Sequence, residues 1–512
     1  MASTKWLRIF LSTGLLLFFG HHAISQSFLN NALLFSRTKA AGSARIQALG
    51  GAQTAIGGDY SSALSNPAGL GMFNRSEVTL SLANTSYSSD VSYLGTKSGD
   101  SFSKFNVPGL SLVLHYPNAG KESGFLGGSF AVSLTRINDI NQEYSYRGSN
   151  SESSIIDYFI EDANFRAPDD PDELLVGGRE FYSLTALAYN NYLLDPIEDG
   201  GDFYYGSVLN KDPDFPDEIR TVNQQETIQR KGAQYQWSIA YGANFSDKFF
   251  AGATLGITTL RYKLTQSYEE SDFDFSSDPS YDPVASFRMN ESLDIQGTGA
   301  NFTLGLIYRP VDFLQIGASF VTPTFYQITD NYDASMESDW NDEEDAFERF
   351  DQPLLSEYNF TTPLRFNVGA TFLSKYGFIT ADAELVNYSK AKYKSDIPDI
   401  SYNVDNADIK STFGSVVNYR VGAEFRYNIY RVRAGYNLMA DPYLNKQGVD
   451  RKIQSLSGGV GVRLKKFYTD LAVISSKTEG RRTPYTASDL PVPLALQKFK
   501  NTNIVLTVGV TF

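Results

Sequence analysis

The segment from residue 49 to residue 70 is the most informative part of this sequence for the fold. It reads Leu49-Gly-Gly-Ala-Gln-Thr-Ala-Ile-Gly-Gly-Asp-Tyr-Ser-Ser-Ala-Leu-Ser-Asn-Pro-Ala-Gly-Leu70. It holds five glycines and one proline, and it fits neither a helix nor a long strand. It is also too weakly apolar to build a core of its own. Because a long series of strand-like segments follows it, we expect the stretch to pack against or inside whatever those strands build.

Residues 1–25 have the features of a secretory signal peptide. A basic start at Lys5 and Arg8 precedes a short apolar run, and Ala23-Ile24-Ser25 fits a cleavage site. The apolar run is too short to span a bilayer as a helix. The mature chain is therefore expected to begin at Gln26 and to be exported.

Composition narrows the class of protein further. The 14% aromatic residues and the absence of cysteine suit β-structure in an oxidising compartment without disulfides. Removing Lys5 and Arg8 with the leader takes the formal charge from −14 to −16, and an acidic mature chain argues against nucleic acid as a partner. No later segment reaches about 18 continuous apolar residues, so any membrane crossing is made by strands.

From Ser76 onward the sequence alternates with a period of two. In Val417–Tyr427 one face is apolar or aromatic and the other is polar or charged, and Leu364–Phe372 and Ile504–Phe512 repeat the pattern. Since successive side chains of a strand point to opposite faces, each segment has one apolar face. A soluble sandwich turns that face to its core, and a membrane barrel turns it to lipid.

Three observations favour the barrel. The segments reach or exceed the roughly 9–11 residues that a tilted strand needs to cross a bilayer. Short connections such as Ser246–Lys248 alternate with long ones, as in outer-membrane barrels. Aromatic residues cluster at strand ends, as in interfacial girdles. Those residues are Tyr402, Tyr419, Tyr427, Tyr430, Tyr436, Phe467 and Tyr468. The predicted long loops are 87–103, 149–221, 270–283, 337–353, 395–410, 439–450 and 477–499.

The sequence therefore predicts an all-β fold, a fourteen-stranded antiparallel transmembrane β-barrel plugged by an N-terminal hatch. The expected divisions are the signal peptide at 1–25, the hatch at 26–75 inside the barrel, and the barrel at 76–512, with 149–221 as its largest outer loop. An even strand number places both chain ends and the entry to the plug on the periplasmic side. The predicted strands are 76–86, 104–116, 123–147, 222–246, 248–268, 284–309, 312–335, 356–373, 377–393, 411–427, 429–438, 451–465, 467–476 and 501–512.

The sequence offers little for catalysis. Two of the three histidines leave with the leader, so His115 alone remains, inside a strand, and no nucleophile, zinc or phosphate-binding motif is present. Acidic runs such as Asp169–Glu173 and Asp339–Asp345 lie in long loops and lack the spacing of a calcium loop, which favours solvated loop charge. We expect no enzyme, no cofactor and no metal site.

Charged residues on the polar strand faces have two interpretations. They form an ion-pair network that braces the barrel and holds the plug, or they line a polar transit path; the network is favoured because a low-dielectric wall favours pairing. These residues are Arg365, Asp382, Glu384, Arg420, Glu424, Arg426, Arg431, Arg433, Arg463 and Asp470.

Loop 149–221 has two amphipathic pieces, and the second, Gly178–Asp195, has apolar residues at near-helical spacing. A lid packed on the barrel mouth and an apolar groove for a greasy ligand stay open as alternatives. The next outer loop would supply the opposite wall. The candidate groove residues are Phe181, Leu184, Leu187, Phe273, Phe275 and Tyr281.

The second and third strands carry weak points. Pro108 interrupts the second, and Gly124, Gly127 and Gly128 crowd the third. Since proline removes a ladder donor and glycine marks bends or bulges, these residues indicate either ordinary curvature or a lateral opening in the wall.

The chain resembles the FadL-type outer-membrane transporters of long-chain fatty acids and hydrocarbons. The segments Gly50-Gly-Ala52 and Asn66-Pro-Ala-Gly-Leu70 resemble the family's N-terminal hatch, and Thr362–Ala370 and Tyr419–Phe425 resemble its strands. The resemblance implies a fourteen-stranded barrel, ligand capture between outer loops, passage past a shifting hatch, and lateral exit near the third strand. The hatch residues so assigned are Gly50, Gly51, Ala52, Asn66, Pro67, Ala68 and Gly69.

We therefore expect an outer-membrane channel of a Gram-negative bacterium for passive uptake of hydrophobic small molecules such as long-chain fatty acids. Its partners are the hydrophobic ligand and outer-membrane lipid. Apolar burial, at about 0.8 kcal/mol per CH₂, drives capture and later partition into lipid. The alternative is a FadL-like barrel of the PorV type that acts as a scaffold or shuttle for exported proteins, with the long acidic loops as the docking surface.

Overall fold

The structure is a computed structural model. It describes residues 22–118, 120–166, 174, 183–199, 202–207, 221–274, 284–341, 345–350, 352–488 and 490–512. The predicted leader therefore falls mostly outside the described residues.

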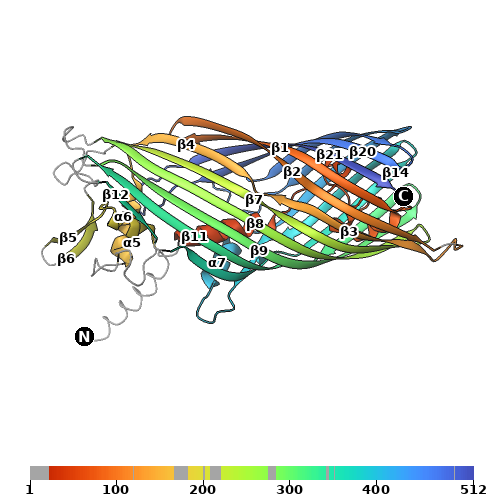
Figure 1. Cartoon of the computed structure of the whole chain (residues 1–512), viewed down its shortest axis with the longest axis horizontal. Helices are drawn as coiled ribbons and strands as arrows, with labels where there is room; N and C mark the ends of the chain where they lie inside the picture. The colour runs from red at the N-terminus through yellow and green to blue at the C-terminus, as the bar shows by residue number, and fades with distance from the viewer. Residues whose placement is uncertain are drawn as a thin grey trace.

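A closed antiparallel barrel of fourteen strand crossings accounts for most of the chain (Figure 1). Pairing of the first and last strands, from Glu77 with Thr511 to Ser92 with Leu496, closes the ring. Four crossings are broken into consecutive strands, namely β3 with β4, β10 with β11, β12 with β13 and β14, and β15 with β16. The strands are β1 (Glu77–Tyr93), β2 (Thr96–Pro117), β3 (Phe125–Asp139), β4 (Gln142–Asn150), β7 (Thr221–Phe245), β8 (Phe249–Asp274), β9 (Val284–Val311), β10 (Leu314–Val321), β11 (Phe325–Trp340), β12 (Ala346–Arg349), β13 (Leu354–Thr361), β14 (Arg365–Ser374), β15 (Gly377–Asn387), β16 (Lys392–Lys394), β17 (Ser415–Tyr427), β18 (Tyr430–Met439), β19 (Ile453–Arg463), β20 (Phe467–Arg482) and β21 (Ala495–Thr511).

The predicted all-β fourteen-stranded antiparallel barrel is confirmed. The predicted long loop 87–103 is wrong, because β1 and β2 pair continuously to Tyr93 and Thr96. Leu94 and Gly95, with φ of 46° and 78°, make the tight hairpin turn that joins them. The inner face of β1 carries Tyr87, Val91 and Tyr93, but residues 96–103 of β2 hold only Phe102 as a large apolar side chain, so the second arm showed no alternation in the sequence.

The strands keep their register while the chemistry of their two faces inverts. Low on β8, Ile257 is exposed on the outer face and Thr258 is buried in the lumen. Higher on the same strand, Arg261 points outward and Tyr262 is buried. The lower zone is therefore a lipid-facing band, and the upper zone is an extension with a polar outside and an apolar inside.

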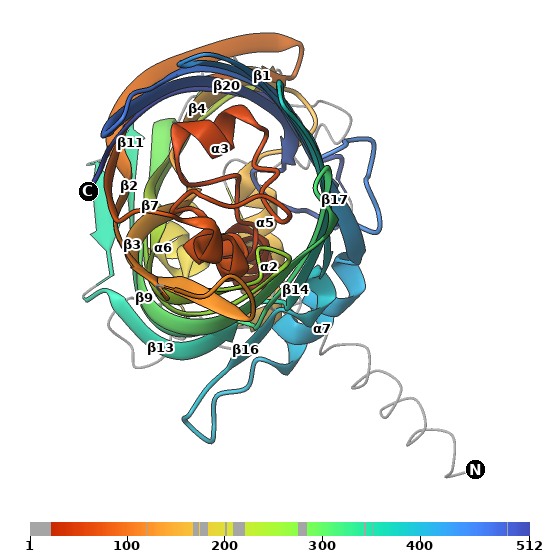
Figure 2. The same ribbon diagram turned by 90° about the vertical axis from the view of Figure 1, so that its right-hand side faces the viewer.

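The N-terminal segment, residues 22–75, runs through the barrel lumen. Figure 2 shows α2 and α3 inside the ring of strands, whereas α7 lies outside it. Among the described residues, no helix is both long and apolar enough to cross a membrane. The helices are α2 (His22–Ser36), α3 (Ala44–Ala48), α4 (Ser62–Ser65), η2 (Pro67–Met72), α5 (Ile155–Arg166), α6 (Leu184–Asn190), η4 (Tyr388–Lys390) and α7 (Asn403–Thr412).

Of the seven predicted girdle residues, Tyr436 and Phe467 are exposed, as are the three tyrosines named next, whereas Tyr402 precedes α7 and its ring contacts Phe28, Tyr358 and Tyr393. Tyr427, Tyr430 and Tyr419 are more than half exposed on the outer face. Tyr468 is wrong as a girdle residue, because its ring lies in the lumen and its hydroxyl donates to Glu77 Oε1 at 2.6 Å. Girdle positions therefore follow the outward face of each strand.

Candidate functional site

Asn66 starts a short helix and fastens it to the wall. Its side-chain Oδ1 accepts a hydrogen bond from Ala68 N, with Pro67 at the first helical position, so Asn-Pro-Ala is a capped helix start. The Asn66 amide donates to Thr54 O at 2.6 Å and to Leu306 O in β9 at 3.2 Å. A side chain at Gly305 of the wall would collide with Asn66 Oδ1, and this explains the glycine there.

A second contact joins the N-terminal segment to β15. Oδ2 of Asp382 accepts hydrogen bonds from Gln53 N at 2.7 Å and from Thr54 N and Thr54 Oγ1, both at 2.8 Å. All three donors are buried, so this carboxylate satisfies groups that water does not reach.

Glycines on both sides let the N-terminal segment approach β18 of the wall closely. Gly50 has φ of +67°, and a Cβ on it would lie 2.6 Å from Tyr436 O. A Cβ on Gly435 in β18 would lie 2.1 Å from Gly50 N. The predicted hatch residues Gly50, Gly51, Ala52, Asn66, Pro67, Ala68 and Gly69 are all buried inside the barrel.

An ion-pair network links α3 to the four strands β17, β18, β19 and β20. Arg45 Nε lies 3.4 Å from Glu424 Oε2, and Arg433 Nε lies 2.7 Å from the same oxygen. Arg433 also reaches Asp470 at 2.7 Å, and Arg463 reaches Asp470 at 2.9 Å. These lumen charges pair with one another and with Arg45 of the plug, as the network interpretation requires.

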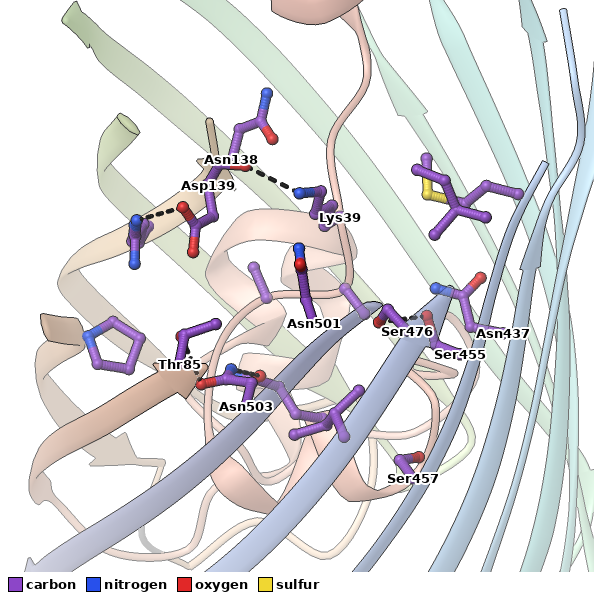
Figure 3. Close-up of a pocket in the computed structure, with 18 of the residues that line it drawn as sticks. Lys39, Thr85, Asn138, Asp139, Asn437, Ser455, Ser457, Ser476, Asn501 and Asn503 are labelled. Carbon is purple, nitrogen blue, oxygen red and sulfur yellow. Dashed lines mark hydrogen bonds and ion pairs between the residues drawn. The ribbon is translucent and has the colours of Figure 1, made fainter. Parts of the chain in front are cut away.

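A cavity of about 140 Å³ lies between the N-terminal segment and the wall (Figure 3). One part of its lining is apolar, and another carries amide, hydroxyl and ammonium groups. The apolar residues include Ile137, Met439, Ile453, Ile474 and Phe499, and the polar ones include Lys39, Asn106, Asn437, Asn501 and Asn503.

The polar part of this lining has spare hydrogen-bonding capacity. Asn437 Oδ1 and Asn106 Nδ2 are buried and find no partner among the described residues. Lys39 Nζ donates to Asp139 O at 2.8 Å, and burial in the lumen holds the pKa of Lys39 below its ordinary value. The cavity can therefore receive a molecule with an apolar body and one polar group. Sequence reasoning missed Asn437, although its place next to outward Tyr436 assigns it to the lumen face.

The wall next to this cavity lacks backbone pairing. The β2–β3 ladder runs from Pro117 with Gly127 to Gly109 with Thr135 and ends there. Beyond it, β2 is joined to the β3–β4 side by side chains, with Lys104 Nζ 2.9 Å from Asn141 Oδ1. Asn106 and Pro108 of β2 both line the cavity, so the cavity reaches the interruption.

The predicted lateral-opening residues lie in two places. Pro108 lies at the interruption, where the β1–β2 register also shifts between Ser81 and Ala83. Gly124, Gly127 and Gly128 lie at the opposite end of β3, near the turn that joins it to β2. The structure does not bring the proline and the glycines together.

The outer mouth holds a packed apolar cluster formed by α5, α6 and the upper strands. Leu187 and Phe273 are buried in it, and Leu184 packs against it. Phe181, Phe275 and Tyr281 lie outside the described residues. The carboxylate of Glu270 fixes the start of α5. It accepts hydrogen bonds from Ile155 N at 3.0 Å and from Gln224 Nε2 at 2.8 Å. The described candidate groove residues thus meet in one closed cluster.

Comparison with known proteins shows which solved structures share this fold. No protein-family model and no curated protein matches the chain. A FadL homologue from Pseudomonas aeruginosa superposes with a TM-score of 0.55 at 11% sequence identity, covering 93% of this chain and 99% of that one. The P. putida toluene transporter TodX gives a TM-score of 0.51 at 13% identity, covering 92% of this chain and 98% of that one. This chain has the FadL-type fold.

A FadL-type barrel with this lipid-facing band is an outer-membrane protein, which confirms the predicted location. The two solved structures are a FadL homologue and a transporter, in keeping with the prediction that the chain is not an enzyme. Across the part of the chain that the structure describes, no three His, Cys, Asp or Glu side chains gather to hold a metal ion.

Proposed function

We propose that this FadL-type barrel takes up hydrophobic small molecules passively across the outer membrane. The observation that carries the proposal is the cavity that touches both the N-terminal segment and the interruption of the β2–β3 ladder. The toluene transporter of similar fold supports the same substrate class.

The route begins in the apolar lumen of the upper zone. A ligand enters past the cluster of α5 and α6, reaches the cavity beside Lys39, and leaves sideways between β2 and β3 at Pro108. Apolar burial of about 0.8 kcal/mol per CH₂ drives each step toward lipid, so no ATP is required. Residues 26–75 act as the hatch that seals the barrel of residues 76–512.

The size of the cavity favours a compact ligand. Its volume of about 140 Å³ is close to that of cavities of roughly 150 Å³ that hold a single benzene molecule. A long-chain fatty acid would place only part of its chain there. Small ring compounds with one polar group fit this lining best.

The scaffold alternative receives less support. A docking surface for an exported protein needs apolar side chains turned outward, yet Leu187 and Ala188 of α6 are fully buried against the barrel mouth. This orientation favours a lid over a partner-binding helix.

A reversible crosslink tests hatch gating. Ala48 of α3 and Ala472 of β20 lie in the same buried cluster, and the chain has no native cysteine, so Ala48→Cys/Ala472→Cys is designed to place one disulfide between plug and wall. In proteoliposomes, oxidation should stop uptake of radiolabelled toluene and oleate, and reduction should restore it. The reduced protein is the matched control. Uptake that is equal in both states would refute gating by this segment.

A further inference from the structure

Short polar side chains form two rows on the outer face of the upper zone. In one row, Thr227 pairs with Ser267, Ser267 with Asn290, and Asn290 with Ser335 across β7, β8, β9 and β11. In the next, Gln229 pairs with Thr265, Thr265 with Ser292, and Ser292 with Asp333. The rows therefore run across the strands at one height.

Longer side chains border these rows on both sides. Above them, Arg288 forms ion pairs of 2.8 Å with Glu269 and with Glu337, all three in register. Below them, Lys231 pairs in register with Lys263. Short residues between two longer borders make a groove, and the hollow there encloses about 480 Å³.

The groove is long and narrow. It extends from Glu143 on β4 to Phe347 and Arg349 on β12. Neighbouring strands lie about 4.8 Å apart, so the groove runs roughly 20–25 Å across the sheet. This shape suits an extended chain lying crosswise to the strands.

The lining offers hydroxyl, amide and carboxylate groups. The groove holds serine and threonine hydroxyls, the Asn290 and Gln229 amides, and the carboxylates of Glu143 and Asp333. Sugar hydroxyls both donate and accept, so they suit the capacity that these groups keep beyond their own contacts, in which Ser267 donates to Asn290 and Gln229 to Glu143. Arg349 pairs with Asp333 inside the groove, so the lining has no uncompensated positive charge to attract an anionic chain, and its polar floor disfavours an apolar one. Phe347, 62% exposed at one end, offers an apolar ring for the C–H face of a sugar.

The height of the groove also fits a cell-surface ligand. Ser292 lies on the same face of β9 as lipid-facing Phe302 and ten residues further from the membrane. At about 3.3 Å per residue this is roughly 30 Å along the strand, on the outer side of the bilayer. From the register, borders, lining and position together, we propose that this outer groove binds a neutral linear glycan of several sugar units.

Calorimetry on the full-length protein in detergent tests the proposal. The probes are neutral linear hexasaccharides (malto-, cello-, manno- and chitohexaose) and the polysaccharide released by mild acid from the lipopolysaccharide of the producing bacterium. We expect at least one probe to bind. Binding of hexasaccharides alone indicates free glycans, and binding of the released polysaccharide alone indicates outer-leaflet lipopolysaccharide.

Paired variants make the test specific. Ser267→Arg/Ser292→Arg fills the groove and should weaken binding about tenfold or more, a loss of about 1.4 kcal/mol. Thr259→Arg/Thr298→Arg places the same charges on the same two strands outside the groove, at two residues that pair in register, and should bind like the parent; Ser267 and Ser292 occupy neighbouring register positions. Gel mobility of the folded barrel verifies both variants. Absence of binding to every probe, or an equal loss in both variants, would overturn the proposal.

Discussion

The carboxylate of Asp382 binds the backbone of Gln53 and Thr54, within the segment of residues 49–70. Its Oδ2 accepts from Gln53 N, Thr54 N and Thr54 Oγ1, and Thr54 O in turn accepts from the Asn66 amide. Asp382 and Asn66 thus fix the same turn from two sides, one from the wall and one from within the plug.

Removing the Asp382 carboxylate should release this turn. In Asp382→Ala, three buried donors lose their acceptor at a cost of about 1–3 kcal/mol each, whereas Asp382→Asn keeps one acceptor oxygen and should lose less. We expect Asp382→Ala to raise ion conductance in planar bilayers and to expose residues 49–70 to added protease. If both substitutions conduct like the parent, Asp382 does not hold the plug.

At the scale of elements, the cavity is bounded by strands that are far apart in sequence. β1 and β2 contribute Thr85, Asn106 and Pro108, and β21 contributes Asn501 and Asn503. The plug forms the remaining wall, so moving it would change the cavity volume directly. The interruption at Pro108 is the point where the same cavity meets the lipid-facing wall.

Filling this cavity should block uptake without unfolding the barrel. Asn501→Trp adds an indole to a space of about 140 Å³. We expect toluene uptake in proteoliposomes to fall about tenfold or more while the thermal unfolding temperature stays close to that of the parent. Thr502→Trp, one residue away on the outward face, is the matched control and should transport normally. Unchanged toluene uptake by Asn501→Trp would show that the ligand does not pass through this cavity.

The sequence predicted the strands where one face meets lipid. Val417–Tyr427 and Ile504–Phe512 alternate fully between apolar and polar residues, and in the structure these segments lie in the strands β17 and β21. It failed at 87–103, because residues 96–103, the second arm of the hairpin, hold only Phe102 as a large apolar side chain and show no period of two. It also failed for cavity residues such as Asn437. The groups that a lumen side chain faces depend on the path of the N-terminal segment through the barrel, and the local sequence pattern of a strand does not contain that information.

Over the whole molecule, the strands keep one register while the environment of their outer face changes from lipid to water. β8 and β9 are mainly apolar outside and polar inside within the bilayer, and mainly the reverse above it. The upper zone therefore behaves like a water-soluble barrel that holds apolar side chains, and it joins without a break to a membrane barrel with a polar lumen. In the proposed uptake, a hydrophobic molecule finds an apolar environment inside the upper zone and outside the lower one, and this inversion would favour a sideways exit.

Charge substitutions along one strand face test the inversion. Leu304 and Gln296 both point outward from β9, with Leu304 49% exposed in the lipid-facing band and Gln296 above it. Arginine in the middle of a bilayer costs a barrel about 2–4 kcal/mol, and arginine near or above the interface costs about 0–1 kcal/mol. Leu304→Arg should therefore lower the free energy of unfolding in phosphatidylcholine vesicles, measured by guanidinium titration, while Gln296→Arg leaves it nearly unchanged. Equal costs at the two positions would mean that the lipid-facing band does not end between them.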